Sequence, residues 1–457
     1  MEKLNFQDAF FLRAESPSCP FHVAGLMIFT PPEGAPANYF RRLAATLGQL
    51  NGLWPVFSKK LHDPDATRTF AWVEATDFDG RDHVYHYSLP QPGRMSDLLR
   101  LVSRAYEGPL DRTRPLWEVH LIEGLPGGQF ALYVMVHHAL VDGVGGLRMI
   151  DELLDRSPRG NVPVSPVQRA TRPNKERPAL TQMLGDSLDA LLKQATAIPE
   201  VSGLLASMGR DTLSGRKDTP QFPFSAPHSI INSELDARRG IVTCDFPLGR
   251  LRAIGARFDG TINDALIAIC GGALRQYLLT QNALPKKSLD AGVPVSIKAD
   301  SAQDGNQLGY ILCPLGTDIS DPAKRMERVV RTTRKAKRDL DHVSPTANAD
   351  FANLMFMPYL VLTLTGQTQR LPPPYNITVS NVPGPAGVQY LEGARLNKIY
   401  PLNIITDGMG LSATAISYNS KLFVSVITCP SRQPGIGSLD KYMKANYEAL
   451  RDALPRA

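Results

Sequence analysis

The sequence lacks the features of several large protein classes. None of its apolar runs approaches the roughly 18 to 20 residues that a membrane-spanning helix needs. The N-terminal stretch MEKLNFQDAFF carries acidic residues, which are unusual in a secretory signal. The cysteines are scattered without a close pair, which argues against a disulfide framework or a thiolate metal site: Cys19, Cys244, Cys270, Cys313 and Cys429. We therefore expect a folded cytoplasmic protein with buried thiols and no metal site.

Several binding and catalytic motifs are also missing. The chain has no Gly-rich phosphate loop of the P-loop or dinucleotide type and no GxSxG nucleophile elbow. Its net charge of +6 comes without a recognition-helix, zinc-finger or RNP-type pattern, so we expect no nucleic-acid partner and no bound cofactor. The densest basic run, KRMERVVRTTRKAKR at residues 324–338, is typical of a solvated helix face, with a phosphate or membrane contact as the alternative.

The chain is long enough for two domains, each with its own core, at 457 residues and 43% hydrophobic composition. Short apolar β-type runs, such as residues 22–29 and 130–136, alternate with helical stretches over residues 1–155. The alternation returns over residues 222–457, where an apolar helix is expected at residues 261–279. Between them, residues 156–221 combine a linker rich in proline, arginine and serine with leucines at helical spacing. The sequence therefore predicts an α/β (α+β sandwich) protein whose two domains are joined by a linker and a helical bridge.

The stretch VMVHHALVDGVGG places two histidines, an aspartate and several glycines after an apolar run at residues 130–136, which predicts a buried strand. Adjacent residues of an extended chain point to opposite faces, so we expect one structural and one functional ring among His137 and His138. A neutral imidazole can take a proton from a hydroxyl or thiol. Asp142 would anchor the following loop through an ion pair or orient an imidazole.

Two other interpretations of these histidines stay open on the residues alone. They are either polar groups satisfied inside the fold or metal ligands. A metal site is the weaker of the two, because HHxxxD lacks a helical i, i+4 histidine pair and no cluster supplies a third ligand.

Four short motifs in order carry a resemblance to a known family. HHALVDG at residues 137–143 fits the HHxxxDG signature of the CoA-dependent acyltransferases. RPLWE at 114–118, the Asn-Asp pair at 263–264, and NVPGP at 381–385 resemble further signatures of the bacterial wax ester synthase/diacylglycerol acyltransferase family. The opening segment, residues 4–29, also resembles the N-terminus of that family, so the similarity runs over nearly the whole chain.

The resemblance implies two chloramphenicol-acetyltransferase-like domains, with mixed sheets flanked by helices and an active-site tunnel at their interface. It implies that His138 is the general base, that His137 supports the loop and that Asp142 is chiefly structural. The implied reaction transfers a long-chain acyl group from acyl-CoA, a co-substrate, to a fatty alcohol or a diacylglycerol, which makes storage lipid. The alternative is a condensation-type or other HHxxxDG enzyme with a different alcohol or amine acceptor. One chain holds both halves, so a monomer suffices.

The remaining motif residues have two kinds of expected role. Supporting residues or oxyanion donors are Gly143, Asn263, Ser380 and Asn381. Asn263 has two expected roles: it caps a helix or makes an interdomain hydrogen bond, or else it assists at the active site. For Asn381, the favoured role is to brace the turn that follows it. Architectural roles are expected for Pro115, Leu116, Trp117, Asp264, Pro383 and Gly384. Because long-chain substrates partition into lipid, we also expect peripheral contact with the inner membrane or lipid inclusions.

Overall fold

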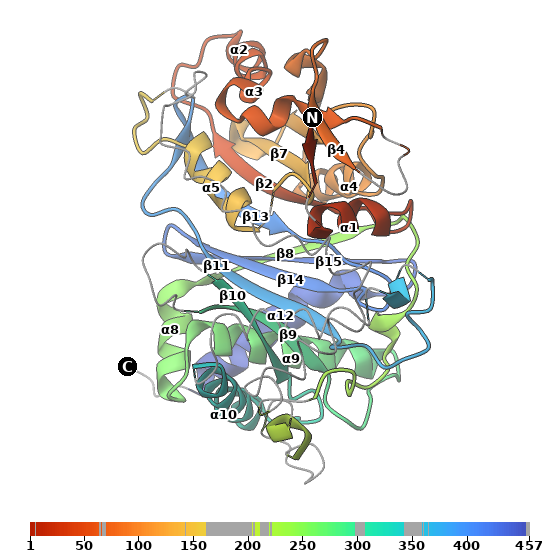
Figure 1. The fold of residues 1–457 in the computed structure, drawn as a ribbon. Helices are drawn as coiled ribbons and strands as arrows, with labels where there is room; N and C mark the ends of the chain where they lie inside the picture. Colours follow the sequence, from red (N-terminus) through yellow and green to blue (C-terminus); the bar gives the residue numbers. More distant parts are fainter. Residues whose placement is uncertain are drawn as a thin grey trace. The chain divides into compact units, whose positions relative to one another are not determined.

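The computed structural model describes residues 1–453 except 5, 64, 66–69, 142, 161–202, 204–205, 211–218, 220–221, 298–306, 342–358, 360 and 364. The described residues fall into two compact units (Figure 1). The first unit takes its residues from the ranges 1–185, 383–404 and 416–419, and the second from 186–382, 405–415 and 420–457. Each unit holds a six-stranded sheet with flanking helices, so the predicted α/β class is confirmed.

The division of the chain at residues 155 and 222 stays a prediction. Residues 383–404, from the C-terminal half, belong to the first unit, although they were expected in the second domain. Most of the predicted linker and helical bridge, residues 156–221, lies outside the described residues.

The sheet of the first unit is mixed. Its strands, in spatial order, are β12 (Tyr390–Leu391), β13 (Ala394–Leu402), β2 (His22–Thr30), β7 (Phe130–His137), β6 (Trp117–Glu123) and β5 (Val84–Ser88). Strand β5 pairs with β6 in parallel, whereas β2 pairs with both β7 and β13 in antiparallel register. The strands expected at residues 22–29 and 130–136 are therefore confirmed, and they are neighbours.

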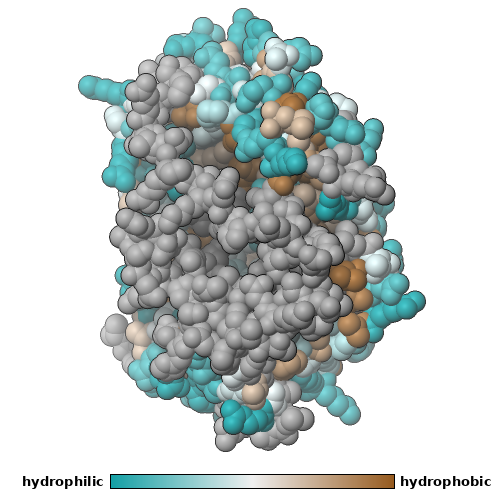
Figure 2. All heavy atoms as spheres, in the orientation of Figure 1, coloured by the Kyte–Doolittle hydropathy of each residue, from teal (hydrophilic) through white to brown (hydrophobic). Residues whose placement is uncertain are grey.

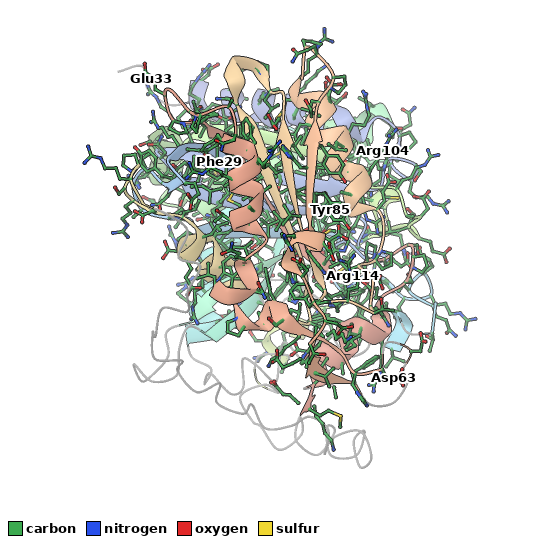
Figure 3. All side chains as sticks on the ribbon, turned by 90° about the horizontal axis from the view of Figure 1, so that it is seen from above. Phe29, Glu33, Asp63, Tyr85, Arg104 and Arg114 are labelled. Atoms are coloured by element: carbon green, nitrogen blue, oxygen red, sulfur yellow. The ribbon has the colours of Figure 1, made fainter. Side chains whose placement is uncertain are left out.

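Helices of the first unit pack on this sheet through aromatic and leucine side chains. The helices are α1 (Phe6–Ala14), α2 (Tyr39–Leu47), α3 (Leu50–Leu53), α4 (Met95–Tyr106) and α5 (Gly143–Leu153). A small separate sheet contains β1 (Glu2–Lys3), β4 (Ala71–Glu74) and β3 (Lys59–Leu61). Phe40 of α2 lies against Phe130, with ring centroids 5.3 Å apart. Phe130 stacks at the same distance on Phe29 of β2, which is labelled in Figure 3. These contacts fix α2 to the sheet.

Tyr106 joins three parts of the first unit. It ends the buried stripe of α4, which also contains Leu98 and Val102 at helical spacing. Its hydroxyl lies 3.0 Å from the carbonyl oxygen of His22 and 2.8 Å from that of Asn403. Because a buried hydroxyl needs a partner, this pair of acceptors ties α4 to β2 and to the C-terminal segment.

Helix α5 begins earlier than the sequence suggests. The glycines at 143, 145 and 146 predict a loop before a helix that starts near residue 146, but the helix already begins at Gly143. A glycine in a helix costs roughly 1 kcal/mol relative to alanine, a penalty that packing can outweigh. A side chain on Gly25 of β2 would meet Ile150 of α5 at 3.8 Å, so helix and sheet are in close contact there.

The second unit surrounds one buried helix. Its sheet has the order β10 (Gln307–Pro314), β9 (Asp290–Ile297), β11 (Ile377–Pro383), β14 (Ser412–Tyr418), β15 (Lys421–Thr428) and β8 (Gly240–Pro247). Its helices include α8 (Leu248–Arg257), α9 (Ile262–Thr280), α10 (Pro322–Asp341) and α12 (Leu439–Asp452). Helix α9 is buried along most of its length and contacts the other three helices, as expected for a helix that is apolar all round.

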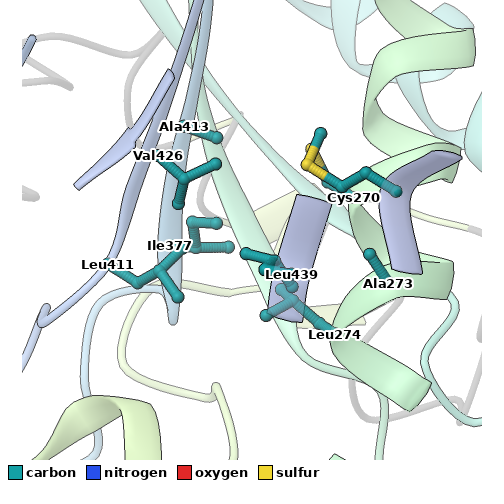
Figure 4. A pocket seen from close by; sticks show the side chains of 9 residues that line it. Cys270, Ala273, Leu274, Ile377, Leu411, Ala413, Val426 and Leu439 are labelled. Carbon is teal, nitrogen blue, oxygen red and sulfur yellow. The ribbon is translucent and has the colours of Figure 1, made fainter. Parts of the chain in front are cut away.

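A small apolar cavity lies in the core of the second unit. Its lining includes Cys270 and Leu274 of α9, Ile377 of β11 and Met443 of α12 (Figure 4). Burial raises the pKa of the Cys270 thiol to about 12, so this sulfur stays a thiol at neutral pH. All five cysteines are unbridged and buried, as the sequence predicts. Apart from the Cys270 thiol, the described residues that line the cavity are apolar, so it is a feature of core packing.

Asp290 is a buried carboxyl at the start of β9. Its main-chain N–H donates to Oδ1 of Asn376 at 2.8 Å, and its carbonyl accepts from the Asn376 N–H at 2.8 Å. Neither carboxyl oxygen has a hydrogen-bond partner among the described residues. Burial raises the pKa of Asp290 to about 7, although Lys287 and Arg328 partly oppose this shift.

The raised pKa of Asp290 predicts a pH-dependent gain in stability from Asp290→Asn. An unfolded aspartate ionises near pH 4, whereas the folded one keeps its proton until about pH 7, so the parent loses stability as pH rises through this window. The variant should be more stable than the parent by about 2–4 kcal/mol at pH 8 and nearly equal to it at pH 4. Urea unfolding at both pH values measures the difference, with surface Asp245→Asn as control. An equal difference at both pH values would contradict this assignment.

Candidate active site

The two histidines lie where β7 ends, and their backbone is held by neighbouring strands. The N–H of His137 donates to the carbonyl of Leu116, which precedes β6, at 2.9 Å. The N–H of His138 donates to the carbonyl of Phe21, which precedes β2, at 2.8 Å. Leu140 donates back to the carbonyl of His137 at 2.9 Å, which closes a turn. Both rings therefore project from a fixed backbone.

His137 is fully buried and both of its ring nitrogens face protein atoms. Nδ1 accepts a hydrogen bond from the N–H of Ala139 at 3.0 Å, so the proton of the neutral ring belongs on Nε2. Nε2 lies 3.4 Å from Oε1 of Glu15. The ring thus connects the loop after β7 to a buried carboxylate, and neither nitrogen is available to a substrate.

Glu15 follows helix α1 and collects donors from separate parts of the chain. Its side chain is 2% exposed; Oε1 accepts from the N–H of Phe21 at 3.0 Å, and Oε2 accepts from Nε and Nη2 of Arg112 at 3.3 and 3.1 Å. Burial by itself raises the pKa of Glu15, but His137, the Phe21 amide and Arg112 outweigh it and hold the pKa below its usual value. The carboxylate is therefore ionised at neutral pH.

His138 lies in different surroundings from His137. Its side chain is half-buried, and its ring centroid is 4.4 Å from that of Phe11 in α1, at an interplanar angle of 47°. Such a tilted contact fixes the plane of a ring without using its nitrogens. The pair therefore consists of one ring locked inside the unit and one that is partly open to solvent.

The RPLWE motif lies beside the histidines. Leu116 and Trp117 are fully buried, and the Trp117 indole N–H donates to the carbonyl of Phe57 at 2.9 Å while its ring stacks on the Phe57 ring. Pro115 is also buried. Because the Leu116 carbonyl holds the N–H of His137, this motif supports the histidine segment through packing and one backbone hydrogen bond.

The Asn-Asp pair lies at the start of α9 in the second unit. Asp264 forms a capping box with Thr261, whose N–H and hydroxyl donate to Oδ2 at 2.7 and 2.8 Å, and Thr333 of α10 donates to Oδ1 at 2.6 Å. The expectation that Asn263 caps this helix is therefore wrong, because Thr261 occupies the cap position. Oδ1 of Asn263 is buried and has no hydrogen-bond partner among the described residues.

The NVPGP motif continues β11 rather than forming a turn at once. The strand runs through Pro383, so the half-buried Ser380 and Asn381 lie inside it. Gly384 then passes so close to β14 that a side chain there would lie 2.1 Å from the carbonyl oxygen of Ser417. The N–H of Gly384 donates a hydrogen bond to the hydroxyl of the same residue, Ser417, at 3.3 Å. Gly384 is thus required by backbone proximity.

The structure brings some of the predicted residues together. His137 and His138 lie at the end of β7, and the three buried residues of RPLWE lie at the start of its neighbour β6. Asn263, Asp264, Ser380 and Asn381 belong to the second unit. Gly143 is the first residue of α5, and Asp142 lies outside the described residues, so its ion pair stays a prediction.

Sequence reasoning did not single out Glu15, Arg112 or Phe11. The only signal for Glu15 was a carboxylate between two apolar segments, FFLRA and PSCPF. Arg112 is separated from Glu15 by 97 positions along the chain, so no local pattern links the two. Only the folded chain shows that the end of α1 contacts both histidines.

Comparisons with known proteins identify the family. The model of the wax ester synthase/diacylglycerol acyltransferase catalytic domain matches residues 4–266, and that of the WS/DGAT C-terminal domain matches residues 304–451. This chain belongs to the WS/DGAT family. The resemblance drawn from HHALVDG, RPLWE and NVPGP is therefore confirmed.

Similar WS/DGAT proteins match the chain from end to end. A Mycobacterium tuberculosis protein named probable diacylglycerol O-acyltransferase tgs2 is 34% identical, covering 99% of this chain and 100% of its own. The O-acyltransferase WSD of Acinetobacter baylyi is 32% identical, covering 100% and 98%. The solved wax ester synthase/diacylglycerol acyltransferase of Marinobacter aquaeolei VT8 is 31% identical, with a TM-score of 0.78 and 99% of each chain covered.

A condensation domain shares the fold at lower identity. The starter condensation domain of rhizomide synthetase RzmA matches with a TM-score of 0.57 at 14% identity, covering 99% of this chain and 96% of its own. At this identity the likeness extends to the fold alone, because one fold serves many chemistries.

The capping geometry of α9 predicts different effects for its two motif residues. Asp264→Ala removes the capping box and the acceptor for Thr333, and should lower the free energy of unfolding by about 1–3 kcal/mol. Asn263→Ala removes no hydrogen bond of Oδ1 seen among the described residues and should change stability by less than about 0.5 kcal/mol. Thermal unfolding of both variants measures this contrast. Equal losses would contradict the assignment of the cap.

Proposed function

We propose that this protein transfers a long-chain acyl group from acyl-CoA to the hydroxyl of a fatty alcohol or a diacylglycerol. The products are a wax ester or a triacylglycerol, together with free CoA. Membership of the WS/DGAT family supports the proposal, as do relatives named for diacylglycerol O-acyltransferase activity. Acyl-CoA is then a co-substrate, and the reaction needs no bound cofactor.

We assign the general base to His138. The observation that carries this assignment is the contrast between the two rings: His137 is buried with its nitrogens facing Ala139 and Glu15, whereas His138 is half-buried. In this mechanism, His138 takes the proton of the acceptor hydroxyl as the oxygen attacks the thioester carbonyl. The C–S bond then breaks, and the imidazolium returns the proton to the CoA thiolate.

The other motif residues have supporting roles in this mechanism. His137 holds the segment that carries His138, and Asp142 anchors the loop after it. The negative oxygen of the tetrahedral intermediate needs a donor, and losing such a donor typically costs about 10² to 10³ in rate. The candidates are Gly143, Asn263, Ser380 and Asn381, of which Asn263 carries an amide whose oxygen has no partner among the described residues.

Thiol release from palmitoyl-CoA tests the assignment of His138. With hexadecanol or dipalmitoylglycerol as acceptor, His138→Ala should lower kcat by about 10²- to 10⁴-fold, the usual contribution of a general base. His86→Ala, at an exposed histidine of edge strand β5 in the same sheet, is the matched control and should keep parental activity. Near-normal turnover by a folded His138→Ala protein would refute the base assignment. If neither acceptor supports CoA release, amines and other alcohols become the next acceptors to test.

We further propose that the protein works at an anionic lipid surface on the cytoplasmic side of the membrane or on lipid inclusions. Within the described part of the chain, no helix has the length and apolarity to cross a bilayer. On the face drawn in Figure 2, the coloured hydrophobic side chains form small groups, and we propose attachment through charge.

Two helices of the second unit supply this charge. Helix α8 has three arginines and no acidic residue, and α10 has eight basic residues against three acidic ones. Their formal charge is therefore +8, whereas the whole chain has +6. Both helices contact α9, and Arg334 of α10 donates to the carbonyl of Asp259 just after α8. We call their exposed cations the basic surface: Arg250, Arg252, Arg257, Lys324, Arg331, Arg334 and Arg338.

Vesicle flotation at low salt tests the basic surface. Each basic residue near an anionic membrane contributes about 1 kcal/mol, so replacing Arg331, Arg334 and Arg338 by glutamine should weaken binding to phosphatidylglycerol vesicles by about 10- to 100-fold. Arg41→Gln with Arg42→Gln, on exposed positions of α2, is the control and should bind normally. Equal binding to neutral phosphatidylcholine vesicles, or no effect of the triple change, would refute this attachment.

A further inference from the structure

We propose that Glu15 is a positioning residue of the acyl-transfer site, acting on His138 through His137 and Phe21. The inference rests on the proposed role of His138. It concerns a residue from the first helical segment of the chain, far in sequence from the HHxxxDG motif. The Glu15 carboxylate would keep the end of β7 in the arrangement that aims the catalytic ring at its substrate.

The first support is the set of donors around the Glu15 carboxylate. An ionised carboxylate with a 2% exposed side chain is costly unless donors surround it. Two groups donate to Glu15, the amide of Phe21 and the guanidinium of Arg112, and Nε2 of His137 lies 3.4 Å from Oε1. Arg112 also donates to the carbonyl of Leu12 in α1, so the guanidinium joins both ends of this turn. The carboxylate is therefore a fixed point inside the unit.

The second support is that this fixed point reaches His138 by separate routes. Glu15 faces His137, whose ring is held from its other side by the Ala139 amide. The N–H of Phe21 donates to Glu15, and the carbonyl of Phe21 accepts a hydrogen bond from the N–H of His138. Phe21 therefore links the Glu15 carboxylate to the backbone of His138. The backbone N–H of Glu15 donates to the carbonyl of Phe11 at 3.1 Å, and the Phe11 ring packs against the His138 ring.

The third support is the contrast with other carboxylate–histidine contacts of the same sheet. Glu123 contacts His86 on the edge of the sheet, where both side chains are about one-third exposed. Glu118 contacts His120 within β6, and its side chain is one-quarter exposed. Among these three contacts, only that of Glu15 has both side chains almost fully buried and joins the end of β7. A contact that only stabilises the fold would not need to join Glu15 to the end of β7, next to His138.

Glu15→Gln is the direct test. Glutamine keeps the size of the side chain but replaces one accepting oxygen by a donating NH₂ group. Because both carboxylate oxygens of Glu15 face nitrogen atoms, this NH₂ group disturbs either His137 or Arg112. A ring displaced by about 1 Å can lose about 100-fold in rate, so we expect kcat to fall by about 10- to 100-fold, with KM for acyl-CoA and alcohol changed by less than about 3-fold. Glu123→Gln is the matched control and should keep kcat within about 2-fold.

A double-mutant cycle separates positioning from general stability. If Glu15 acts through His137, Glu15→Gln should lower kcat much less, by under about 3-fold, in a His137→Asn background than in the parent. Losses that multiply would overturn the proposed route, and so would an unchanged kcat in Glu15→Gln. His138→Ala is measured in parallel: if it stays active, the proposed role of His138 as the base fails, whereas its inactivity beside a fully active Glu15→Gln overturns this inference alone.

A measurement on the unaltered protein keeps the inference testable if Glu15→Gln does not fold. Nitrogen-15 NMR of the labelled imidazoles reports which nitrogen of each neutral ring carries the proton. The geometry requires His137 to carry it on Nε2, because Nδ1 accepts from the Ala139 amide. Assignment of a His137 signal with the proton on Nδ1 would overturn the arrangement from which the positioning role is inferred.

Discussion

Neighbouring side chains at the end of an extended strand point to opposite sides of the sheet, and this constraint separates His137 from His138. One ring is buried between the Ala139 amide and the Glu15 carboxylate, and the other is half-buried beside Phe11. The histidine pair therefore combines a fully enclosed ring with a partly exposed one. The strands on either side of β7 hold both residues through their backbone N–H groups.

Buried carboxyl groups show how the chain treats charge inside each unit. Glu15 and Asp264 are surrounded by donors and connect separate segments: Glu15 joins α1 to the ends of two strands, and Asp264 joins the start of α9 to α10. No donor in the described part of the chain reaches the Asp290 carboxyl, and burial raises its pKa instead. Buried carboxyls with donors hold elements in place, whereas burial without donors favours the protonated form.

Much of the fold was predictable from periodicity. The runs at 22–29, 130–136 and 261–279 become β2, β7 and α9 with bounds that differ by one residue, because strong apolar patterns bury the same face in almost any context. The prediction of a loop at the glycines before residue 146 was wrong, because α5 already begins at Gly143 and packing there outweighs helix propensity. Strand β13 was missed: its pairing with β2 joins opposite ends of the chain, which no local pattern reveals.

The site was predictable in its motifs and not in its supports. HHALVDG identified the two histidines, and alternation required that they differ, but only the fold shows which ring is enclosed. The expectation that Asn263 caps α9 was wrong because Thr261, two residues before it, takes the cap position and forms a capping box with Asp264. Glu15 and Arg112 could not be found, since their contacts with each other and with His137 depend on three-dimensional proximity alone.

Direct transfer with His138 as base is the central claim, and a single-turnover experiment tests it most directly. Enzyme in excess is mixed with acyl-labelled palmitoyl-CoA, with and without hexadecanol, and label is followed in ester and in protein. The mechanism predicts label in the ester only when hexadecanol is present, no protein-bound label, and almost no ester from His138→Ala. Acyl label on the protein before acceptor is added, or parental ester formation by His138→Ala, would contradict it.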